Sequence, residues 1–247
     1  MARSYLKEET LNIAPGITLV NPYIGDILDD EQAYYGIAST LTSVPFQYMV
    51  QLDDMGIDYE KINEWQFFQM MFLSYCKQAE ADENGYVKGI DLVFKDIELR
   101  GFETFHDNET NEDYLFNLNT GVKIDELCFK DVTTILRKLN NFEHCKSKPG
   151  NEAAKKYLLE KERKKLRRQK RKGYEPYLER LVIGMVNMPE FKYNYEQTMD
   201  MRLYTFNQSF LQVQHKVTFD KTMIGVSIGF ADTSKMKDKS ILSWIKF

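Results

Sequence analysis

The chain of 247 residues has only three cysteines, three histidines and no long hydrophobic run. Cys76, Cys128 and Cys145 form no C-x-x-C pair and leave one thiol unpaired, so we expect reduced thiols rather than a disulfide framework. The longest apolar stretch is too short to cross a bilayer. The first residues, MARSYLKEETLN, lack the apolar core of a signal peptide, and we therefore expect a cytoplasmic location.

The histidines give no sign of catalysis. His106, His144 and His215 lie in three separate predicted elements, and none belongs to a motif such as H-E-x-x-H. The glycine-rich phosphate-binding motifs are also absent from the sequence, and the isolated stretch GVSIG at 225–229 indicates close helix packing at most. We therefore expect a protein that is not an enzyme and uses no cofactor.

The strongest metal candidate is the stretch EADENGYVKGID at residues 80–91, whose spacing is similar to that of a twelve-residue calcium loop. Its oxygen ligands would come from Glu80, Asp82, Asn84 and Asp91. Glu at the first position and the shorter Asp at the last fit such a loop poorly, and the sequence that follows favours a strand where a helix is needed. Because Asn-Gly forms a tight turn unaided, we favour a plain turn and no metal site.

Charge is spread unevenly along the chain. The net charge is −4, yet residues 155–172 contain eleven Lys or Arg and only two acidic residues, which gives +9 there and −13 over the other 229 residues. We favour a solvated helical linker for this segment, with nucleic-acid binding and docking on an acidic protein surface as alternatives. Its basic arm consists of Lys164, Lys165, Arg167, Arg168, Lys170 and Arg171.

Hydrophobic periodicity predicts an α+β fold that is mainly helical, with a small antiparallel β insertion near residues 86–124. A further short strand is expected within 16–25. Helices are expected at 29–41, 44–56, 57–78, 129–142, 151–172, 175–188 and from Thr205 or Asn207 onward. In the last of these, the apolar residues Phe210, Val213, Val217, Met223 and Ile224 share a face.

The breaker KSKPGN at 146–151 is the best candidate for a domain boundary. It separates an N-terminal helical domain with the β insertion, residues 1–146, from a C-terminal helical region, residues 151–247. Asn151 is a suitable N-cap for the basic helix, and Gly173 is a suitable end.

Three stretches of the C-terminal half carry a resemblance to known proteins: PGNEAAKKYLLEKERKK, ERLVIGMVNMPEFKYNYEQTMDMRLYTFNQS and FDKTMIGVSIGFADTSKM. Their layout resembles tail-module proteins from phages and prophages of Gram-positive bacteria, described as tail assembly chaperones or tail-associated proteins. LTSVPFQYMVQLDDMGIDYEKINEWQFFQMMF looks like the corresponding front part, so the resemblance covers most of the chain beyond residue 20. The family has no catalytic residues to transfer.

The resemblance implies a viral protein that holds the tape-measure or tube protein in the host cytoplasm during tail assembly. Such a role needs an apolar groove for a partner helix and no chemistry. Alternatives are a structural component of the tail or baseplate, located in the virion, and a nucleic-acid-binding protein that uses residues 155–172. The residues expected to line the groove are Trp65, Phe68, Met71, Phe72, Met185 and Met188.

Overall fold

The computed structural model describes residues 4–145, 151–230, 233–236 and 238–246. Its N-terminal half contains β1 (Thr10–Ala14), β2 (Ile17–Val20), α1 (Ile24–Asp29), α2 (Glu31–Thr42), η1 (Pro45–Tyr48), α3 (Met49–Asp54), α4 (Glu64–Ala81), β3 (Phe102–Asp107), β4 (Glu112–Asn117), β5 (Lys123–Ile124) and α5 (Glu126–Asn140). The C-terminal part contains α6 (Glu152–Lys172), α7 (Leu178–Val186), α8 (Tyr195–Met199), α9 (Leu203–Ser227), η2 (Thr233–Lys235) and η3 (Ser240–Leu242).

The predicted fold class is confirmed: the chain is α+β and mainly helical, with two small antiparallel sheets. One sheet pairs β1 with β2, and the other has the order β3-β4-β5. The strand within 16–25 is therefore confirmed, but its partner β1 was missed. β1 is five residues long and buries only Leu11 completely, so it has too little alternation to be recognised.

The β insertion is smaller than predicted. Within 86–101 the structure contains turns and one isolated bridge, between Phe94 and Leu19, instead of a strand. In this segment, tight turns bury apolar residues that lie close together in the sequence. In one of these turns, the N–H of Phe94 donates to the carbonyl of Ile90 at 2.7 Å. The segment also pairs with the edge of β2, because the N–H of Val20 donates to the carbonyl of Val93 at 3.0 Å.

The helices form where caps and periodicity agree. α5 buries all four predicted residues, Val132, Ile135, Leu136 and Leu139. α4 begins at Glu64 rather than near residue 57, because the Asn63 side chain accepts from the N–H of Gln66 and caps the helix there.

Aromatic rings from α4 and α5 fill the centre of the N-terminal half. The ring of Phe68 lies 5.8 Å from that of Phe72 and 5.0 Å from that of Phe129, measured between centroids. Trp65 joins the group and donates its indole N–H to the carbonyl of Asp113 at 3.1 Å. These rings anchor the β3-β4-β5 sheet to the helices.

One contiguous set of buried side chains joins this centre to α7 and α9. The backbone of residues 22–24 meets that of residues 201–203: the N–H of Ile24 donates to the carbonyl of Met201 at 2.9 Å, and the N–H of Leu203 donates to the carbonyl of Pro22 at 2.8 Å. Arg202 lies over the ring of Tyr23 and pairs with Glu9. The predicted boundary at 146–151 falls largely on residues 146–150, which lie outside the described residues.

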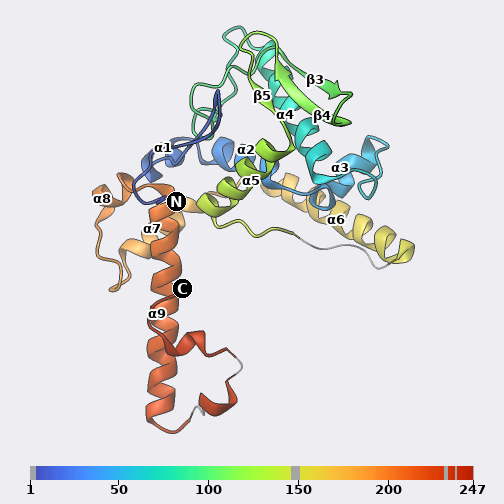
Figure 1. Cartoon of the computed structure of the whole chain (residues 1–247). Helices are drawn as coiled ribbons and strands as arrows, with labels where there is room; N and C mark the ends of the chain where they lie inside the picture. The colour runs from blue at the N-terminus through green and yellow to red at the C-terminus, as the bar shows by residue number, and fades with distance from the viewer. Residues whose placement is uncertain (1–3, 146–150, 231–232, 237, 247) are drawn as a thin grey trace.

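Figure 1 shows α9 extending away from the rest of the molecule as a long stalk, with the C-terminal residues folded back against it. α6 runs along the edge of the main body beside α3. Among the described residues, no helix combines the length and apolar character needed to cross a membrane.

Candidate partner-binding groove

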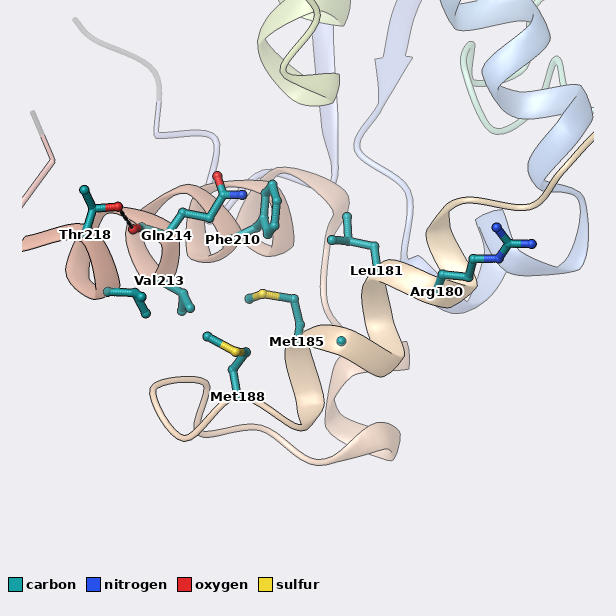
Figure 2. Close-up of a pocket in the computed structure, with 10 residues that line it drawn as sticks. Arg180, Leu181, Met185, Met188, Phe210, Val213, Gln214 and Thr218 are labelled. Atoms are coloured by element: carbon teal, nitrogen blue, oxygen red, sulfur yellow. Dashed lines mark hydrogen bonds between the residues drawn. The ribbon is translucent and has the colours of Figure 1, made fainter. Parts of the chain in front are cut away.

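The clearest apolar groove lies between α7 and α9 (Figure 2) and has a volume of about 540 Å³. Met185 and Met188 form one wall, and their thioethers point toward Val213 of α9. Phe210 and Val217 extend the opposite wall along α9. Methionine side chains are flexible and polarisable, so a groove with this lining can adapt to different apolar partners.

The local sequence explains why the groove stays open. α7 places Leu178, Val182 and Met185 on its buried face, and Met185 also borders the groove. Gly184, the residue before Met185, lines the groove too, and a Cβ placed there would meet no atom within 4 Å. A larger residue at this position would occupy space that a partner can otherwise use.

The apolar surface continues toward the far end of α9. Met223 and Ile224 are exposed on the helix, and Ile228 and Phe230 follow its end with 72% and 91% of their surface exposed. An exposed apolar series of this length marks an interaction surface in many proteins. The structure therefore shows a groove near the body and an uncovered apolar end on the stalk.

Of the residues expected to line a groove, the structure brings together only Met185 and Met188. Trp65, Phe68 and Phe72 are core residues, with 7%, 2% and 0% of their surface exposed. This corrects the expectation for these three: α4 turns its aromatic face inward against α5 and the sheet, so these side chains are not available to a partner in the fold.

Met71 lies elsewhere again. It is half-buried beside a second hydrophobic cluster that joins α3 and α4 to α6. What the sequence did not reveal is that α9 supplies the second wall of the groove. The signal was present in the predicted face of Phe210, Val213 and Val217, but that pattern does not say which helix lies opposite.

The basic helix α6 forms as predicted, with Asn151 accepting from the N–H of Ala154 and with Gly173 at φ +75° past its end. The helix is not solvated on all sides as expected for a linker, because its contacts with the body continue as far as Leu166. Leu158 and Leu159 pack together with Leu166 against the hydrophobic cluster formed by α3 and α4. Residues 167–173 are exposed.

The protein's own acidic surface holds the docked side of α6. The ammonium group of Lys155 lies 2.7 Å from Oδ1 of Asp58 and 2.6 Å from Oε2 of Glu60. These hydrogen bonds raise the pKa of Lys155, and the bond from Lys155 holds the pKa of Asp58 below its ordinary value. Arg163 pairs in the same way with Asp53 and Asp54. Part of the basic segment is thus neutralised within the molecule.

The 80–91 stretch forms a tight turn. Oδ2 of Asp82 accepts from the N–H groups of Asn84 and Tyr86, at 2.9 and 3.0 Å, and Gly85 has φ +71°. Asp91 accepts from the hydroxyl of Tyr86 at 3.1 Å, and Glu80 is exposed on α4. Among the described residues, no cluster of three or more His, Cys, Asp or Glu has the arrangement needed to hold a metal ion.

The three histidines pair with three different partners. Nδ1 of His106 lies 2.8 Å from Oδ1 of Asp113 across the β3–β4 pair, and Nε2 of His144 lies 2.9 Å from Oε1 of Glu64. His215 lies on α9, 2.7 Å from the carbonyl of Ser243. Each contact fastens neighbouring segments together, which is a structural role.

Comparison with known proteins adds one match. Residues 168–246, less than half of the chain, match the family model described as the YomV second domain. This family is phage-derived and of the Bacillus prophage type, which supports a phage origin for the chain. The matched residues include every residue that lines the groove between α7 and α9. No curated protein and no solved structure matches the chain.

Proposed function

We propose that the chain is a non-enzymatic phage tail assembly factor that binds a helix of another viral protein, such as the tape-measure protein, in the groove between α7 and α9. The observation that carries this proposal is the apolar lining of the groove, in which Met188 and Phe210 are half-buried while Met185 and Val213 are buried. An amphipathic helix buries its apolar face in grooves of this kind. The protein would act in the host cytoplasm while tails are assembled.

The charges at the groove define the partner further. Arg180 lines one end, is exposed, and forms no ion pair with another described residue. A partner helix with an acidic residue at the corresponding end of its apolar face would satisfy this guanidinium group. We therefore propose an apolar helical segment with an acidic flank as the ligand.

The test is a binding titration with overlapping helical peptides from the tape-measure and tube proteins of a phage that encodes this chain. Gly184→Phe places a ring in the groove where the backbone leaves open space. Gly36→Phe is the matched control, because Gly36 is also an exposed helical glycine with no atom within 4 Å of a Cβ. We expect a peptide to bind the parent protein and Gly36→Phe equally, and to bind Gly184→Phe at least about 10-fold more weakly, a difference of about 1.4 kcal/mol.

Two results would count against the groove. In one, no tape-measure or tube peptide binds the parent protein. In the other, both glycine variants bind as tightly as the parent, which would place the partner elsewhere on the molecule. Circular dichroism of both variants establishes that they are folded before the comparison is made.

A structural role in the tail or baseplate is the second candidate. It is supported by the uncovered apolar residues Ile224, Ile228 and Phe230 at the far end of α9, which suit a permanent contact. Mass spectrometry of purified virions separates the two roles. Stoichiometric copies in the virion would favour the structural role, and absence from the particle would favour the assembly factor.

A further inference from the structure

Docking gives the basic helix α6 two different sides. The inner side carries Lys155 and Arg163, whose charges are neutralised by four acidic residues, and the three leucines that pack on the body. Lys155, Leu159, Arg163 and Leu166 recur at steps of four, four and three residues, so they occupy one face of the helix, which Leu158 borders. The remaining basic residues are therefore left on the opposite side.

The free side carries a regular series. Tyr157, Lys161, Lys164, Arg168 and Arg171 follow one another at steps of four, three, four and three residues, which places them on one face. All five are exposed, and none of the four cations forms an ion pair with a residue in the described part of the chain. Arg167 and Lys172 flank the series and are also exposed, while Glu160 is the acidic residue on this side.

We propose that this outer face of α6 binds the sugar-phosphate backbone of a nucleic acid. Ten residues of helix separate Lys161 from Arg171, about 15 Å at 1.5 Å per residue. Phosphates of one strand follow each other every ~3.4 Å along a duplex, so the series spans about four such intervals, which is about five phosphates. The series of cations thus has the length of a short stretch of sugar-phosphate backbone and carries the opposite charge.

The composition of this face favours nucleic acid over an acidic protein. Specific protein interfaces have an apolar centre from which charged residues are depleted. The outer face of α6 has no aliphatic side chain between Lys161 and Arg171, and point charges are sufficient for phosphate contacts. Tyr157, 65% exposed at the start of the series, can stack on a base of a single strand.

The test uses fluorescence anisotropy of the full chain with labelled single-stranded and duplex oligonucleotides of mixed sequence. Five phosphate contacts, from the four cations of the series and Arg167, give a slope of log K against log salt of about −4.5 on duplex DNA. Binding should then weaken about 500-fold between 50 and 200 mM salt. The single-stranded oligonucleotide should bind more tightly than the duplex if Tyr157 stacks, and Tyr157→Ala should remove that preference.

Charge-neutralised variants supply the control. The quadruple variant Lys164→Gln, Arg167→Gln, Arg168→Gln, Arg171→Gln retains one cation of the five, so the same change of salt should weaken its binding only about 3-fold. The control variant Lys77→Gln, Lys95→Gln, Lys221→Gln, Lys239→Gln has the same net charge and removes exposed lysines elsewhere, so it should bind like the parent. Thermal melts check that both variants are folded.

Three outcomes would overturn the proposal. The first is no binding at 50 mM salt, and the second is an equal loss of oligonucleotide binding in the two quadruple variants. The third is displacement of the oligonucleotide by polyglutamate whose concentration of negative charge is equal to or lower than that of the oligonucleotide. The last would identify an acidic protein as the ligand. Gly184→Phe should leave nucleic-acid binding unchanged, because the groove and the outer face of α6 share no residue.

Discussion

Tyr174 donates its hydroxyl proton to Oε1 of Glu31 at 2.7 Å, which ties the segment between α6 and α7 to the first residue of α2. The N–H groups of Tyr177 and Leu178 donate to the same oxygen, at 2.7 and 3.0 Å. One buried carboxylate thus satisfies the first N–H groups of α7 and sets where α7, a wall of the groove, begins.

Glu31→Ala should therefore destabilise the protein by about 2–4 kcal/mol, because two backbone N–H groups and a hydroxyl lose a charged acceptor, and the N–H of Leu178 is buried. Urea unfolding followed by circular dichroism measures this change. Glu31→Gln should cost less, since its amide oxygen can still accept. Glu83→Ala, at an exposed position, is the control, and an equal loss in both alanine variants would contradict the role given to Glu31.

Lys155→Gln should lower the stability of the protein near neutral pH and have a smaller effect in acid. The hydrogen bond from Lys155 holds the pKa of Asp58 below its ordinary value of 3.8, so the stabilisation is present above about pH 3.8 and is lost as the pH falls through the lower, folded-state pKa. Urea unfolding at pH 6 and at pH 3 should show the difference between parent and variant narrowing in acid. Lys156→Gln, next in the chain and exposed, should show no such pH dependence.

Gly184→Ala should stabilise the protein by about 0.5–1 kcal/mol, because alanine is the better helix former and its Cβ meets no atom within 4 Å. A rise in melting temperature measures the effect. Gly85→Ala should have the opposite effect, since Gly85 has φ +71° and a Cβ there would lie 2.7 Å from the Arg100 guanidinium carbon. A melting temperature for Gly184→Ala below that of the parent would show that α7 needs the glycine for packing.

Cys145 should be the thiol that reacts quickly with Ellman's reagent in the folded protein at pH 8. Cys76 and Cys128 are buried, and burial raises the pKa of each to about 12, so almost none of either is thiolate at that pH. Cys145→Ser should remove the fast phase, and denaturant should expose two further thiols. Fast reaction of the Cys145→Ser variant would show that α4 or α5 opens readily.

The sequence predicted the helices better than it predicted the groove. Asn151 and Gly173 mark the ends of α6, and Val132, Ile135, Leu136 and Leu139 mark the buried face of α5, because caps and periodicity act within one element. The segment 86–101 was misjudged because its apolar residues are buried by turns, and short apolar runs do not distinguish turns from strands.

The groove depends on contacts between elements, which local patterns do not specify. Phe68 and Phe210 both lie on apolar helix faces, yet Phe68 is sealed by α5, whereas Phe210 is half-buried and borders the groove between α7 and α9. Only the packing of one helix on another separates these two cases. Likewise, the basic residues surround α6 in the sequence, and docking on α3 decides which of them are free.

The pairing of residues 22–24 with residues 201–203 has a consequence for how the chain folds on the ribosome. At about 5–20 residues per second, roughly 10–40 s separate the synthesis of these two segments. During that time α1 lacks its contacts with α8 and with residues 201–203, so part of the surface that it buries in the folded protein stays uncovered. Closure of the core is therefore a late event, timed by the emergence of the first turn of α9.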